Sequence, residues 1–285
     1  MNDMFVTIFL KALFPGINKG LIEFRAILEK DIFKLFVPQD LKKLEFVWPY
    51  NGTKNIYFGV ATRNDKSSGK KENCNYLSAI FIDIDCGTDG HKKASWFKTK
   101  EDALAHLKRL NLEESIVVDS GHGLHVYWLL EKPLELTTEN IQKAETLMKK
   151  IASVCGGDTA YDVSRLLRLP GTVNIKDGKS VECKILYQNY EQKYDFEDLI
   201  QKFQIHPGFL ISLDLLKKND HSVLFLKALY GIENFGMTDR SALDQKIICY
   251  LLKQGFSEEN LISVFKYFPT SGKFLERYEN DPTGQ

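Results

Sequence analysis

The sequence has no excess of either charge, no closely paired cysteines and no long apolar run, and each absence excludes a class of protein. Its 285 residues carry 38 basic and 38 acidic side chains, for a formal net charge of zero. Composition therefore provides no general attraction for nucleic acid, and any basic surface has to come from local segregation of charge. The hydrophobic fraction of 44% is ordinary for a globular protein with one large or two medium domains.

The five cysteines contain no CxxC pair, so neither a disulfide framework nor a zinc site with ordinary ligand spacing is indicated. Free thiols are typical of a reducing cytoplasm, and we expect a cytoplasmic protein without structural zinc. The apolar residues 1–14 include Asp3 and Lys11 and have no basic leader before a long apolar core. This segment fits neither a signal peptide nor a membrane span, and we expect a helix docked on the fold.

Hydrophobic periodicity predicts a mixture of strands and helices over the first two thirds of the chain. The expected strands are 20–28, 56–61, 79–85, 115–119, 124–130 and 181–187, and the expected helices are 100–110, 137–154 and 194–203. Leu21, Phe24 and Ile27 are the expected core residues of the first strand. Thr138 is the expected N-cap of the second helix. The polar, basic segment 63–71 is expected to be a mobile loop.

The pattern changes near His206, beyond which we find helices and no convincing strand. Residues 239–252 have amphipathic spacing and stop before Gly255, and Ser257 is the expected N-cap of a further helix. We therefore predict a domain boundary at about residue 206, which divides the chain into 1–206 and 207–285.

Asp83 and Asp85 alternate with Ile82 and Ile84 at the end of an apolar strand. Because side chains alternate between the two faces of a strand, both carboxylates point the same way. Adjacent carboxylates repel each other and resist desolvation, and a divalent cation relieves both costs. Hard oxygen ligands favour magnesium or manganese. The alternative is a strand end where the acids simply meet solvent.

A second cluster begins at Asp119 and reads Asp-Ser-Gly-His-Gly-Leu-His-Val-Tyr-Trp, in which two glycines favour a tight strand–turn–strand. Ser120 and His122 lie in the turn, and His125 follows on the outgoing strand. A hydroxyl, glycine amides and two imidazoles form a reasonable cradle for a triphosphate. The alternative is a glycine hairpin whose histidines are only hydrogen-bonded.

A third cluster begins at Asp158 and reads Asp-Thr-Ala-Tyr-Asp-Val-Ser-Arg-Leu-Leu-Arg. Asp162 is the expected N-cap of a short turn. One helical turn then separates Arg165 from Arg168, so that both can face one anion. Either arginine can instead form an ion pair with Asp158 or Asp162.

In this order, the three clusters resemble the catalytic motifs of the archaeo-eukaryotic primase superfamily. Upstream, residues 55–63 resemble the segment before the first motif in mobile-element and CRISPR-associated primase-polymerases. Downstream, residues 239–244 and 255–262 resemble the helical primase C-terminal (PriCT) module. The resemblance covers about residues 18–275, and the combination is specific although each motif is short.

The resemblance implies an α+β fold, with an N-terminal α/β unit packed on a sheet like that of an RNA-recognition motif and a small all-helical module after it. It makes Asp83, Asp85 and Asp162 the catalytic metal ligands, with Asp158 as the fallback for the third.

The same resemblance assigns nucleotide binding to the second and third clusters. Ser120 and His125 would contact the phosphates of the incoming nucleotide. His122 lies beside them, where many relatives carry arginine or glycine. Arg165 or Arg168 would be a further phosphate or template contact, and the resemblance does not choose between them.

The implied activity is template-dependent nucleotidyl transfer with two Mg²⁺ or Mn²⁺ ions, which synthesises or extends primers. The implied partners are a single-stranded DNA template, a primer, and NTPs or dNTPs, with no membrane. Further domains and replication or CRISPR proteins are additional candidates. Sugar preference and biological pathway stay open.

Two other functions would account for part of these motifs. An HUH-type nicking nuclease or relaxase would use His122 and His125 as metal ligands and Tyr127 as the nucleophile. Its usual histidines are separated by one residue rather than two, and the paired aspartates would be left unused. A noncatalytic single-stranded nucleic-acid binding protein would keep the fold alone, and the intact acids in all three motifs argue against it.

Overall fold

The computed structural model describes residues 2–16, 20–39, 45, 48–87, 95–110, 113–158, 161–202, 228, 235–253, 255–257, 261, 264–265 and 273. The chain divides into two compact units, one made of Met1–Ala103 and Leu112–Ile200 and the other of Leu104–Asn111 and Gln201–Gln285. The predicted boundary at residue 206 lies outside the described residues. The boundary stays a prediction.

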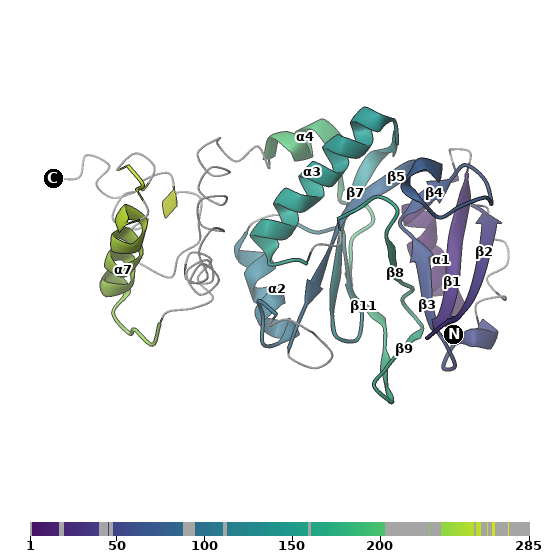
Figure 1. Ribbon diagram of the computed structural model, residues 1–285, viewed down its shortest axis with the longest axis horizontal. Coiled ribbons are helices and arrows are strands. Elements are labelled where there is room, and N and C mark those ends of the chain that lie inside the picture. The colour runs from purple at the N-terminus through teal and green to yellow at the C-terminus, as the bar shows by residue number, and fades with distance from the viewer. Residues whose placement is uncertain are drawn as a thin grey trace. The chain divides into compact units, whose positions relative to one another are not determined.

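The first unit is built on a ten-stranded sheet (Figure 1). Eight strands follow one path, in the order β11 (Lys184–Gln188), β6 (Ile116–Asp119), β7 (Gly123–Glu135), β5 (Cys74–Asp85), β4 (Ala61–Arg63), β1 (Leu21–Leu28), β3 (Asn55–Gly59) and β8 (Leu166–Arg168). Beside this path, β2 (Asp31–Pro38) pairs with β1, and β12 (Lys193–Tyr194) pairs with β7. A separate two-stranded sheet joins β9 (Val173–Lys176) and β10 (Lys179–Glu182).

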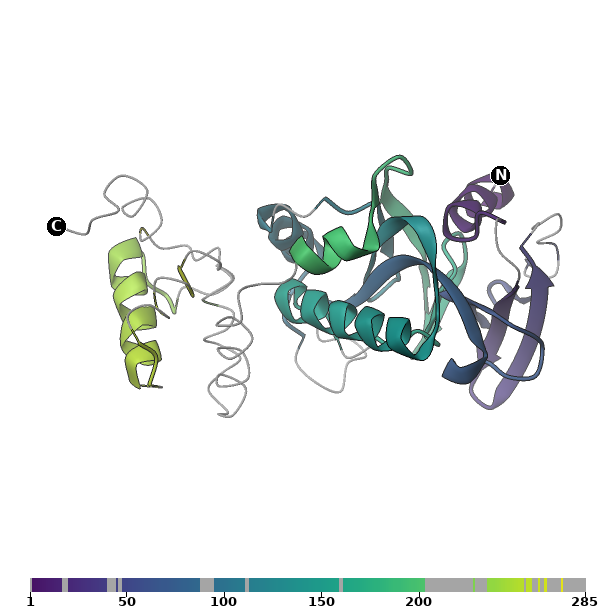
Figure 2. The same ribbon diagram turned by 90° about the horizontal axis from the view of Figure 1, so that it is seen from above.

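Helices cover both faces of this sheet, as Figure 2 shows. They are α1 (Asn2–Leu13), α3 (Thr138–Cys155) and the short α4 (Phe196–Lys202), with 3₁₀ turns at Trp48–Tyr50 and Lys71–Asn73. The helix α2 (Lys100–Arg109) begins in this unit. On the α1 face, Phe9 makes edge contacts with Phe58 and Tyr127, with ring centroids 5.6 and 5.8 Å apart. Because both faces are covered, the middle of the central strand β5, from Leu77 to Ile82, is buried without alternation.

Several predicted elements are confirmed. The docked N-terminal helix is α1, and the helices predicted at 100–110 and 137–154 are α2 and α3. The N-cap of α3 is Thr137 rather than Thr138, because the side chain of Thr137 accepts a hydrogen bond from the backbone N–H of Asn140. In the second unit, α7 (Arg240–Lys253) confirms the predicted amphipathic helix. The helix predicted after Ser257 lies largely outside the described residues.

Two predictions of local structure hold only in part, because long-range pairing replaces the remainder. The strand predicted at 181–187 is broken at Cys183, whose N–H donates to Thr172 and whose carbonyl accepts from Gly171. On either side of the break, β10 pairs with β9, and β11 pairs with β6. The turn predicted from Asp162 toward residue 167 is present only as far as Arg165, whose N–H donates to the carbonyl of Asp162 at 3.1 Å, and β8 then pairs with β3. Arg165 and Arg168 are therefore not one helical turn apart.

Residue Arg63, predicted at the start of a polar loop, is fully buried. Its Nε donates to Glu23 Oε2 at 2.9 Å, and the Glu23 side chain is also excluded from solvent. The remaining guanidinium donors reach the carbonyl oxygens of Ala61 at 2.8 Å and Ser164 at 3.1 Å. The first strand thus buries a charge among its core residues, while the predicted core residues Leu21 and Ile27 are only half-buried.

The pKa of Glu23 is the balance of two opposing effects. Burial by itself raises the pKa of the carboxyl group. The hydrogen bond from Arg25 and the charges of Arg63, Arg25 and Lys34 outweigh burial and hold the pKa below its ordinary value. The carboxylate is therefore ionised at neutral pH, and the buried guanidinium of Arg63 has its counter-ion.

Among the described helices, none is long and apolar enough to cross a membrane. All five cysteines are free thiols, and four of them are buried.

We predict that Glu23→Gln lowers the free energy of unfolding by about 3 kcal/mol, because it leaves Arg63 as a buried charge without its partner. The matched control is Glu139→Gln, whose solvent-exposed pair with Lys143 should contribute little to stability. Urea unfolding at pH 7 measures both. Because the folded pKa of Glu23 is depressed, the difference from wild type is fully present above the ordinary value of 4.5 and shrinks as the pH falls through the folded value. Equal effects of the two variants would contradict the prediction.

Candidate functional site

The first two sequence clusters meet on one face of the sheet because β5 and β7 are neighbouring antiparallel strands. Their register places Asp83 opposite His125 and Asp85 opposite Gly123. Side chains directly opposite each other lie on the same face. Asp83 Oδ1 is 3.7 Å from His125 Nε2, and 21% of the Asp83 side chain is exposed whereas His125 is buried. The predicted common face for the acids is therefore observed, and His125 joins it.

The turn between β6 and β7 is held in shape by its own backbone and by Asp119. The N–H of Ser120 donates to the carbonyl of Gly123 at 3.0 Å, and Asp119 Oδ1 accepts from the N–H of Gly121 at 2.8 Å. Lys100, at the start of α2, neutralises Asp119 at 2.6 Å. Any side chain at Gly123 would meet the carbonyl oxygen of Ile84 closer than 3.0 Å, so glycine lets the hairpin close against the strand that carries the acids.

Asn174, which the sequence motifs did not single out, holds the turn between β6 and β7 in place. Its side chain is buried and donates to the carbonyl of Ser120 at 2.7 Å. The backbone N–H of Cys86 donates to the carbonyl of His122 at 3.1 Å, which ties the other side of the turn to the end of β5. Asn174 lies in β9, just beyond the turn at Pro170 and Gly171. The hydrogen bond itself has no sequence signal.

Of the two aspartates in the third cluster, the structure brings Asp158 next to Asp83. The backbone N–H of Asp158 donates to the carbonyl of Asp83 at 2.8 Å, and its negative charge acts on the Asp83 carboxyl group. Asp162 Oδ1 instead accepts from the hydroxyl of Ser164 at 2.6 Å, and Asp162 lines a separate pocket with Arg165. The position predicted as the fallback is therefore the one that neighbours the paired acids.

The two arginines of this cluster have different partners. Arg165 Nη2 lies 3.8 Å from Asp158 Oδ2, so the alternative prediction of an ion pair with Asp158 is confirmed for Arg165. Arg168 Nη1 donates to Asn55 Oδ1 at 2.8 Å, and its guanidinium lies 4.8 Å from the ring centroid of Tyr57. Charges from both arginines reach Asp83 and His125.

Burial and mutual repulsion strongly alter the titration of this site. Burial first, and then the charges of Asp158 and Asp85, raise the pKa of Asp83 to about 8, although both nearby arginines oppose this. Burial, followed by the charges of Arg168 and Arg165, lowers the pKa of His125 to about 3. Without a bound cation, the carboxyl group of Asp83 therefore resists ionisation at pH 7, and the imidazole of His125 is neutral.

The donor chemistry of these acids fits a divalent cation of the magnesium type. Within the described ranges, no group of three or more His, Cys, Asp or Glu side chains is arranged as a complete metal site. Magnesium, however, is commonly bound through one or two carboxylates together with waters and substrate phosphates. Asp83 and Asp85 supply such a pair, Asp158 adds charge beside it, and a cation would relieve the repulsion that raises the Asp83 pKa.

Tyr127, the nucleophile of the relaxase hypothesis, is enclosed. It is 1% exposed, it packs against Phe9, and burial raises the pKa of its hydroxyl well above the ordinary value. A phenol shielded in this way cannot reach a DNA phosphate, so this arrangement disfavours covalent catalysis by Tyr127.

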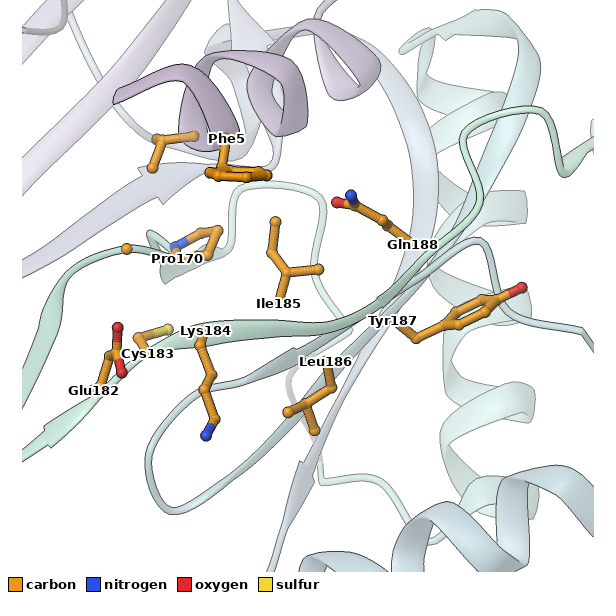
Figure 3. Close-up of a pocket in the computed structure, with 11 residues that line it drawn as sticks. Phe5, Pro170, Glu182, Cys183, Lys184, Ile185, Leu186, Tyr187 and Gln188 are labelled. Carbon is orange, nitrogen blue, oxygen red and sulfur yellow. The ribbon is translucent and has the colours of Figure 1, made fainter. Parts of the chain in front are cut away.

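A second feature of this unit is an apolar pocket of about 310 Å³ at the edge of the sheet. Figure 3 shows Phe5 of α1 above Ile185 of β11, with Pro170 beside them. None of the predicted site residues lines this pocket. We therefore keep the candidate site at β5 and β7.

Comparisons with known proteins give a consistent picture. The family model described as the RepB DNA-primase N-terminal domain matches residues 66–209, about half of the chain. A replication protein from Clostridium perfringens is 28% identical over 155 residues, which are 52% of this chain and 36% of the relative. The chain thus spans about a third of the length of this curated relative.

Among solved structures, the archaeo-eukaryotic primase domain of the cyanophage S-2L primase-polymerase matches with a TM-score of 0.52. The match covers 70% of this chain and 97% of that chain at 17% identity. The crystal structure of primase RepB′ is 12% identical, with a TM-score of 0.48 over 98% of this chain and 95% of that chain. The cyanophage match shows the fold, and the predicted α+β class is confirmed.

We predict that Tyr127→Phe leaves the free energy of unfolding within about 1 kcal/mol of wild type, because it removes a buried hydroxyl that has no hydrogen-bond partner among the described residues. Urea unfolding measures the change. If Tyr127 were a nucleophile, the wild-type chain incubated with single-stranded DNA would form a denaturation-resistant adduct that the variant lacks. We expect no adduct from either protein.

Proposed function

Because this chain belongs to the family of RepB DNA-primase N-terminal domains, we propose that it is a template-dependent nucleotidyltransferase that synthesises or extends primers on single-stranded DNA. The observation that carries the proposal is the opposition of Asp83 and His125 across β5 and β7, with Asp85 and Asp158 beside them. Acids and phosphate-binding groups converge there on one sheet face. A noncatalytic binding protein has no need of clustered carboxylates that repel one another.

In this proposal, Asp83, Asp85 and Asp158 hold Mg²⁺ or Mn²⁺ ions. When bound, these ions lower the pKa of the attacking 3′-hydroxyl and offset the negative charge of the phosphates and of the departing pyrophosphate. The protein's own part is to position the reactants. The acids lie on a central strand whose neighbours are fixed by backbone pairing, which keeps the site rigid.

The hairpin supplies the contacts to the incoming nucleotide. A neutral His125 can donate a hydrogen bond to a phosphate oxygen without repelling the metal ions, and its lowered pKa keeps it neutral at physiological pH. Ser120 adds a hydroxyl, with His122 beside it in the turn. Arg165, beside Asp158, is the better placed of the two arginines to follow a phosphate at the acids, whereas Arg168 is engaged with Asn55 and Tyr57.

We further infer that residues 207–285 form a PriCT-like module. The support is the sequence resemblance together with α7, whose buried Leu243, Ile247 and Leu251 form one face of a helix. Association with a mobile element or a CRISPR system remains a proposal from the upstream resemblance at residues 55–63.

We predict that Asp83→Asn reduces nucleotide incorporation by roughly a hundredfold or more, because it removes a negative ligand at the point where charge must be balanced. The assay uses the full chain, a primed single-stranded template, labelled NTPs or dNTPs, and Mg²⁺ or Mn²⁺. The control is Asp177→Asn, an exposed position with φ of 50°, where asparagine fits equally well. Near wild-type incorporation by Asp83→Asn would sink the proposed site.

A comparison of Asp158→Asn with Asp162→Asn identifies the third carboxylate. We expect Asp158→Asn to reduce incorporation severely and Asp162→Asn to reduce it only a few-fold, because Asp158 is adjacent to Asp83. Manganese binding to each variant, followed by electron paramagnetic resonance, gives a second readout. If Asp162→Asn reduced both incorporation and manganese binding more than Asp158→Asn, Asp162 would be the third metal ligand.

A further inference from the structure

A second polar site lies beside the catalytic acids in the first unit. It is a pocket of about 560 Å³ formed by the β1–β2 hairpin, the loop after β4 and the segment that leads into β8. Four of its ten lining residues are cationic, namely Arg25, Lys34, Lys70 and Arg165, and one, Asp162, is acidic. In a chain with no net charge, this is the local segregation of positive charge that nucleic-acid binding requires.

The positive charge of this pocket is only partly neutralised from within. Glu23 Oε1 lies 2.7 Å from Arg25 and 3.3 Å from Lys34, while Glu23 Oε2 is taken by the buried Arg63. One carboxylate therefore serves three cations. Because 25% of the Arg25 side chain and 35% of the Lys34 side chain stay exposed, both can also reach an anion in the pocket.

The loop wall is held in place rather than left open. Asn73 Nδ2 donates to the carbonyl oxygens of Asp65 and Ser68, at 3.0 and 2.5 Å. Gly69 lies over the Glu23 carboxylate and the Arg25 guanidinium, where any side chain would come closer than 3.0 Å to both. This close approach brings Lys70 to the same pocket as Arg25 and Lys34.

Arg165 connects this pocket to the acids. It lines the pocket, and its guanidinium lies 3.8 Å from Asp158, whose backbone N–H is bonded to the carbonyl of Asp83. An anion in the pocket is therefore next to the site of nucleotidyl transfer. The phosphates of the incoming nucleotide are already assigned to the hairpin that carries Ser120 and His125.

We propose that this pocket binds backbone phosphates of a nucleic-acid strand and guides the strand to the catalytic acids, an inference that rests on the proposed function. Guanidinium and ammonium groups are the usual partners of phosphodiesters. Partly exposed cations contributed by several segments suit a continuous strand better than one enclosed phosphate group.

The test is the double variant Lys34→Ala/Lys70→Ala of the full chain. Fluorescence anisotropy follows binding of a labelled single-stranded oligonucleotide over a series of NaCl concentrations, without metal or nucleotide. Loss of two phosphate contacts should weaken binding roughly tenfold and reduce the slope of log K against log salt by about 1.4. The control, Lys132→Ala/Lys193→Ala, removes the same charge from exposed positions outside the pocket and should leave the slope unchanged.

Urea unfolding checks that the double variant is folded. If it is not folded, the single variant Lys70→Ala is used instead, and half the change in the salt slope is expected. An unchanged salt slope in the folded variant would overturn the proposal. So would weaker binding of a fluorescent nucleoside triphosphate with intact DNA binding, because the pocket would then hold a nucleotide. Binding is measured without catalysis, so the two proposals can fail separately. If the salt slope changes as expected but the chain never incorporates nucleotides, the proposed function is rejected and the assignment of the pocket to strand binding is retained.

Discussion

The buried ion pair of Glu23 and Arg63 is the constraint on which much of the first unit depends. A charge removed from water needs a partner and saturated hydrogen bonds, or it costs several kcal/mol. The donors of Arg63 meet this need by holding β4 and the carbonyl of Ser164, which brings the third sequence cluster to the N-terminal strands. The second carboxylate oxygen of Glu23, Oε1, contacts Arg25 and Lys34. One buried pair thus sets both the path of the segment before β8 and the charge of the pocket beside it.

The proposed catalytic arrangement depends in turn on the register of β5 and β7. A slip of one residue would move His125 to the opposite face from Asp83 and separate the two clusters. The hairpin tip is fixed at both ends, by Asn174 on Ser120 and by Cys86 on His122, so the register has little freedom where the chemistry is proposed. Rigid placement matters because phosphoryl chemistry of this kind relies on positioned charge more than on a reactive side chain.

The third cluster shows where periodicity misleads. Its spacing of arginines fits a helical turn, but Leu166–Arg168 is a strand because β3 offers an unpaired edge. The position of Asp158 follows from the end of α3, where Gly156 takes a left-handed conformation with φ of 70° and the chain turns back to the carbonyl of Asp83. The two consecutive glycines before Asp158 were the available signal, since helices commonly end at glycine.

The sequence by itself determined the elements whose cause is local. Alternation in β5 placed Asp83 and Asp85 on one face, and motif order pointed to the fold that the cyanophage primase-polymerase domain shares. Tertiary structure alone decided what depends on distant partners: the choice of Asp158 beside Asp83, the burial of Arg63 and Tyr127, and the support from Asn174. The physical reason is that periodicity reports which face a side chain takes. Which segments share a pocket, and whether a charge is buried there, is fixed by pairing between residues far apart in the chain.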